Sequence, residues 1–97
     1  MREIILSEIQ IIPVKPQGGL CGFASAVIND SFYIGNIAIY TSPNTSEGYR
    51  LVFPIKTLPN GKKVDCFYPI NKDVGKIVTQ AIVKEYKTLM ENFHHIH

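Results

Sequence analysis

The sequence predicts an α+β fold: a small, mostly antiparallel β-sheet of about five strands, followed by one C-terminal amphipathic α-helix. Two observations carry this prediction. Up to residue 68, short runs rich in β-branched and aromatic residues are separated by Pro, Gly, Asn and Asp. From residue 71 onward, apolar residues recur every three or four positions, as in a helix. The 97 residues have the length of a single domain, so we assign 1–97 to one unit.

The first expected strand is EIILSEIQIIPV (3–14), in which three isoleucines share one parity: Ile5, Ile9 and Ile11. Pro13 and Pro16 argue against a continuous central strand beyond Ile12, because proline cannot donate a ladder hydrogen bond. FASAVI (23–28) and FYIGNIAIY (32–40) form the next pair, joined by the turn residues Asn29 and Asp30.

The strand expected at 32–40 is apolar on both parities, with Ile34 and Ala38 on one and Ile37 and Ile39 on the other. A sheet covered on both faces, by a helix or a second subunit, explains such a pattern. It motivates the prediction of a homodimer, in which an edge strand pairs across a two-fold axis to give one continuous sheet.

A polar loop is expected at 41–48, which has the composition of a mobile segment. YRLVF (49–53) is the fourth strand and KVDCF (63–67) the fifth, with a tight turn at Pro59 and Gly61 between them. The helix is expected over residues 74–93, capped by Asn71 or Asp73. The tail 94–97, which holds all three histidines, is expected to be disordered.

Positive charge belongs to the second half of the chain. Residues 1–48 carry two basic and four acidic groups, a balance of −2, whereas residues 49–97 carry eight and four, a balance of +4. Five lysines fall within 21 residues: Lys56, Lys62, Lys63, Lys72 and Lys76. They are either solvated surface residues or contacts to phosphates, which ammonium groups can bind without reading bases. Tyr49, Phe67 and Tyr68 either pack in the core or stack on bases.

No enzyme is predicted, because no convergent set of titratable groups is specified by a motif. Asp65, the most conspicuous acid, is expected to face outward or to partner a lysine of the turn. No cofactor, metal site or small-molecule substrate is expected. Cys21 and Cys66 have no CxxC spacing, and with no signal peptide or apolar run of membrane-spanning length they are expected to be reduced, mostly buried thiols of a cytoplasmic protein.

FPIKTLPNGKKVDCFYPIN, followed by a helix containing AIVKEY, resembles the septation and sporulation regulator family called stage V sporulation protein G. The resemblance covers roughly residues 3–88. It also includes the hairpin ASAVINDSFYIGNIAI. The matching positions are Pro54, Lys56, Pro59, Asn60, Gly61, Asp65, Pro69, Ile70, Asn71, Ala81, Ile82, Glu85 and Tyr86.

This resemblance implies a small homodimer that binds DNA, and in some members RNA, and that affects division septum placement and sporulation. The family commonly carries basic residues at three positions occupied here by Thr57, Val64 and Gly75. We therefore expect a nucleic-acid-binding regulator contacting phosphates through the five lysines. The alternative is a protein-interaction module of the same fold without nucleic-acid affinity.

Overall fold

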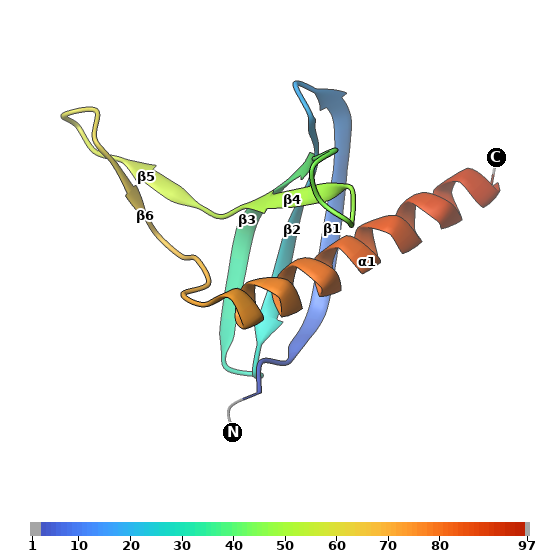
Figure 1. Ribbon diagram of the computed structural model, residues 1–97, viewed down its shortest axis with the longest axis horizontal. Helices are drawn as coiled ribbons and strands as arrows, with labels where there is room; N and C mark the ends of the chain where they lie inside the picture. Colours follow the sequence, from blue (N-terminus) through green and yellow to red (C-terminus); the bar gives the residue numbers. More distant parts are fainter. Residues whose placement is uncertain (1–2, 97) are drawn as a thin grey trace.

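The computed structural model describes residues 3–96, and the side chains of residues 3–92 (Figure 1). Six strands precede one helix: β1 (Leu6–Gln17), β2 (Leu20–Ile28), β3 (Phe32–Thr41), β4 (Tyr49–Val52), β5 (Ile55–Thr57), β6 (Lys63–Asp65) and α1 (Lys72–Ile96). The first four strands form an antiparallel sheet in the order β1-β2-β3-β4, while β5 and β6 form a separate two-stranded sheet. The α+β prediction is confirmed.

Strand β1 continues through Pro13 and Pro16 to Gln17, beyond the expected end at residue 14, but as an edge strand and not as the central strand that the prolines argue against. The reason is position: β1 lies at the edge of the sheet, where a missing N–H can face solvent. Its pairing with β2 is also irregular between Pro13 and Gln17.

A β-bulge in each of two strands shifts the face on which the side chains lie. In β1, Glu8 has a φ of 47°, and one extra residue stands between the pairs Ser7↔Val27 and Gln10↔Ser25. The shift brings Leu6 onto the core face with Ile9 and Ile11, so Ile5 is exposed rather than grouped with them.

The second bulge lies in β3 at Asn36, which has a φ of 57°. The pairs Ala24↔Ile37 and Ala26↔Ile34 leave an extra residue in β3, so Ile34 and Ile37 are both buried despite their opposite parity. The bulge therefore explains part of the apolar pattern on both parities of this strand, for which a strand covered on both faces is the other explanation.

The turn between β2 and β3 forms at the residues that the sequence predicted. Asn29 and Asp30, with φ values of 50° and 54°, are the central residues of a β-turn in the loop between β2 and β3, and the Ser31 N–H closes this turn by donating to the Ile28 carbonyl at 2.9 Å. The Asn29 side chain also accepts a hydrogen bond from the backbone N–H of Ile5 at 2.8 Å, which ties the start of the chain to this turn.

Helix α1 crosses one face of the four-stranded sheet (Figure 1). Asn71 caps it, because its Oδ1 accepts a hydrogen bond from the Val74 N–H at 2.8 Å. The buried residues of α1 are Val78, Ile82, Val83 and Tyr86; the first, second and fourth pack with the buried residues of β2 and β3. The helix extends to Ile96, beyond its expected end at residue 93. His97 lies outside the described residues, and the disorder expected for 94–97 stays a prediction.

Close packing of α1 on the sheet depends on Gly22. A Cβ at this position would lie 3.2 Å from the Ile12 carbonyl oxygen and 3.4 Å from the Tyr86 ring. The Tyr86 ring also meets Tyr49 edge to face, with 5.2 Å between the centroids. Tyr49 is therefore a packing residue, one of the two roles expected for it.

Candidate nucleic-acid interface

Strands β5 and β6 form an arm, residues 54–66, that rises away from the four-stranded sheet (Figure 1). The sequence pattern did not predict β5 as a separate strand, because Pro54 ends the strand expected at 49–53. The arm's turn is closed by the Gly61 N–H donating to the Leu58 carbonyl at 2.9 Å, and Gly61 has the predicted positive φ of 87°. The Asn60 side chain accepts from the Lys62 N–H at 2.9 Å.

The arm presents three exposed lysines. In its register Thr57 pairs with Lys63 and Lys56 pairs with Val64. Because directly paired residues share a face, Lys63 lies on one face of the arm and Lys56 on the other, while Lys62 lies beside the turn. The lysines thus surround a narrow two-stranded ribbon rather than projecting from one side of it. Asp65 is exposed and pairs with Ile55.

Lys72 and Lys76 lie elsewhere, one turn apart at the start of α1. Together with Thr45, Ser46 and Glu47 they line a groove of about 450 Å³ between the 42–48 loop and the helix. Gly75 and Thr79 complete this loop–helix groove. Two ammonium groups, hydroxyls and the amino end of a helix suit an anion, but the Glu47 carboxylate opposes it.

The 42–48 loop is held in place by its own hydrogen bonds. The Ser42 N–H donates to the Gly48 carbonyl at 2.8 Å, and the Thr45 hydroxyl donates to the Tyr49 carbonyl at 3.0 Å. The Ser46 hydroxyl donates to the Glu47 carboxylate at 3.1 Å. These contacts position Glu47 against α1.

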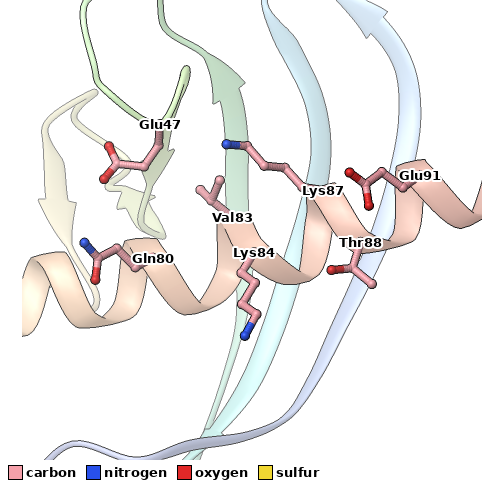
Figure 2. A pocket seen from close by; sticks show the side chains of 7 residues that line it. All are labelled: Glu47, Gln80, Val83, Lys84, Lys87, Thr88 and Glu91. Carbon is pink, nitrogen blue, oxygen red and sulfur yellow. The ribbon is translucent and has the colours of Figure 1, made fainter.

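Further along α1, Glu47 lines a second groove, of about 370 Å³, together with residues that are not among the predicted site residues, including Lys84 and Lys87. In Figure 2, Lys87 and Lys84 leave α1 in opposite directions, with Lys87 on the side where Glu47 lies. The Lys87 Nζ lies 5.9 Å from the centroid of the Tyr49 ring. The spacing of Lys84 and Lys87 from Lys76 along the helix is the sequence signal that could have identified them.

A third groove, of about 400 Å³, lies where the β2–β3 end of the sheet meets the segment between the arm and α1. Its walls are mostly apolar and aromatic and include Phe32, Phe67, Tyr68 and Ile70. The Tyr68 side chain is 56% exposed and Phe67 is 37% exposed, so neither is a core residue. Both remain available for stacking.

The buried polar contacts belong to packing. Cys21 is buried, and its thiol donates to the Ile39 carbonyl at 3.3 Å. Burial, and next the adjacent Cys21 thiol, raise the pKa of Tyr86 well above its ordinary value. Cys66 is exposed, so the expectation that both thiols are buried is wrong for it: it follows β6 at the base of the arm, outside the core.

Among the described residues, no group of three or more His, Cys, Asp or Glu side chains is arranged to hold a metal ion. Within the same residues, α1 lacks the continuous apolar character that crossing a bilayer requires.

Fold and surface define a small α+β protein, with a four-stranded antiparallel sheet, one covering helix and a lysine-bearing arm. Its sequence matches the profile of the SpoVG family over residues 4–88, and the chain belongs to that family.

Three curated relatives support this family assignment. The chain is 26% identical to a protein of Acholeplasma laidlawii, over 89% of this chain and 88% of the relative. It is 25% identical to one from Agathobacter rectalis, over 90% and 97%, and 23% identical to one from Caldanaerobacter subterraneus, over 90% and 92%. Each of the three relatives is named "Putative septation protein SpoVG". The predicted family is confirmed.

Proposed function

We propose that this protein is a homodimeric regulator that binds the sugar–phosphate backbone of DNA or RNA, and so acts on septation, sporulation or gene expression. The observation that carries the proposal is the placement of the lysines. Lys56, Lys62 and Lys63 surround the arm, and Lys72 and Lys76 line the loop–helix groove. All five are exposed.

The arm suits contact with a phosphate backbone for geometric reasons. A two-stranded β-ribbon is narrow enough to enter a major groove, which is about 12 Å wide. With lysines on both faces, such a ribbon can meet the phosphates on either side of it. Its flexible ammonium groups favour binding that depends on charge more than on sequence.

The loop–helix groove supplies a second set of contacts. Lys72 follows the capping residue Asn71, so its ammonium group adds to the positive end of the helix dipole. Glu47 offsets part of this potential. The groove therefore supports a weaker contribution than the arm.

Neutralising the arm tests the proposal. A variant carrying Lys56→Gln, Lys62→Gln and Lys63→Gln removes up to three phosphate contacts. The negative slope of log K, where K is the association constant for duplex DNA, against log salt should therefore become shallower by about 2.7. On the same basis, the double variant Lys72→Gln, Lys76→Gln should make this slope shallower by up to about 1.8.

The control variant Lys15→Gln removes one positive charge from an exposed residue of β1, outside the arm and outside the grooves along α1. Fluorescence anisotropy with labelled duplex DNA and single-stranded RNA gives the slopes. An arm variant that binds with the affinity and slope of the unmodified protein refutes the assignment. Absence of binding by the unmodified protein at low salt favours a protein-interaction module instead.

A further inference from the structure

The face of the four-stranded sheet opposite α1 carries an apolar row that crosses every strand. The register pairs Ile12 with Phe23, Phe23 with Ala38, and Ala38 with Val52. Directly paired residues share a face, so these four side chains lie side by side. Their neighbours Ile11, Ala24, Ile37, Ile39 and Leu51 belong to the core on the helix side. The row therefore lies on the other face, which we call the open face.

No helix or strand of the described chain covers the open face, since α1 lies on the opposite side of the sheet (Figure 1). Ile12 is 66% exposed and Val52 37% exposed, while Phe23 and Ala38 are half-buried. Tyr33, which pairs with Val27 on this face, is 74% exposed. A contiguous apolar surface of this kind marks an interaction site.

We propose that the open face is the surface through which two copies of this chain associate, sheet against sheet. This inference rests on the homodimer of the proposed function and specifies where its interface lies. Self-association is favoured by the distribution of charge. Arg50 is the charged residue among those that pair across β3 and β4 on this face, and it lies at the margin over the Tyr40 ring, 4.8 Å from its centroid.

A two-fold axis through the apolar row would therefore bring apolar groups together without opposing like charges at the centre. The same feature disfavours nucleic acid as the occupant, because phosphates require cations.

The size of the face is sufficient for a dimer. Four strands about 4.8 Å apart, with β2 about 30 Å long, give an area on the order of 570 Å² per copy in projection. Two such faces bury on the order of 1,100 Å² in total, which clears the ~1,000 Å² expected of a biological interface. Face-to-face packing of twisted sheets is a common arrangement.

The sheet edges are less suited to association than the open face. Strand β1 presents Pro13 and Pro16, which lack an N–H, and a bulge at Glu8. Strand β4 has four residues and is followed by Pro54. Both features are devices that limit edge pairing. We therefore keep the homodimer expected from the sequence, but we place its interface on the open face of the sheet and not at the edge of a strand.

The test replaces exposed members of the row, which leaves the core intact. The variant Ile12→Glu, Val52→Glu places two carboxylates per copy, four in the dimer, on the faces that association would bury. Because opposed like charges cost several kcal/mol, the dimer dissociation constant should rise by about 100-fold or more. The matched control is Ile70→Glu, which changes an 86% exposed side chain at the rim of the apolar groove.

Sedimentation velocity across a micromolar concentration series measures association, and circular dichroism confirms that each variant is folded. The expected result is a dimer for the unmodified protein and for Ile70→Glu, and a monomer for the double variant. If the double variant remains a dimer, or if Ile70→Glu dissociates instead, the proposed interface is wrong but the homodimer is not. An unmodified protein that sediments as a monomer overturns the homodimer as well. Nucleic-acid binding is measured separately, so its failure leaves these results unchanged.

Discussion

The bulge at Asn36 determines which face of β3 enters the core, and its backbone conformation makes a quantitative prediction. Asn36 has a φ of 57°, in the left-handed region, which Gly and Asn adopt more readily than β-branched residues. Replacing Asn36 by Val should cost about 1–2 kcal/mol of unfolding free energy in backbone strain. For a domain of this size, each kcal/mol shifts Tm by about 4–8 °C, so Tm should fall by about 4–16 °C.

Thermal unfolding followed by circular dichroism measures this change. Asn36→Gly should stay close to the unmodified protein, because glycine accepts the same φ without strain. Thr41→Val is the matched control at the exposed end of β3. If Asn36→Val and Asn36→Gly melt at the same temperature, the bulge does not constrain the strand, and the explanation given for burial of both Ile34 and Ile37 fails.

Three further outcomes are expected. Asn71→Ala removes the cap of α1 and should lower the unfolding free energy by about 1 kcal/mol, measured by urea denaturation. Glu47→Gln removes the carboxylate from the loop–helix groove and should tighten DNA binding by roughly 2- to 5-fold in anisotropy titrations, with no gain contradicting the role of the groove. The pKa of Tyr86 is raised in the folded state. The contribution of Tyr86 to stability is therefore complete below the unfolded-state pKa near 10 and is lost as the pH rises above that value. Tyr86→Phe should reduce this loss of stability at alkaline pH, measured by denaturant titration.

Sequence patterns predicted the elements whose signals are local. The Asn29-Asp30 turn, the positive φ of Gly61 and the cap at Asn71 all follow from side-chain chemistry within a few residues. The helix period was equally clear, because α1 packs one stripe against a sheet. Membership of the family followed from ordered Pro, Gly and Asp positions.

Features that depend on pairing partners could not be predicted in the same way. Whether Pro13 and Pro16 end β1 depends on its being an edge strand, which the strand order decides. The bulges at Glu8 and Asn36 change the parity of their strands, and an alternation count assumes that parity is constant. The arm lysines were predicted as a group, but their division between two faces follows from the β5–β6 register.

The salt dependence of nucleic-acid binding by the unmodified protein tests the central claim most directly. If each of the five lysines meets one phosphate of duplex DNA, log K should fall with log salt at a slope of about −4.5 per copy. Affinity should then drop by roughly 500-fold between 50 and 200 mM salt on that slope. Binding that is undetectable at 50 mM salt, or equally strong at both concentrations, would contradict a phosphate-binding role for the arm and the loop–helix groove.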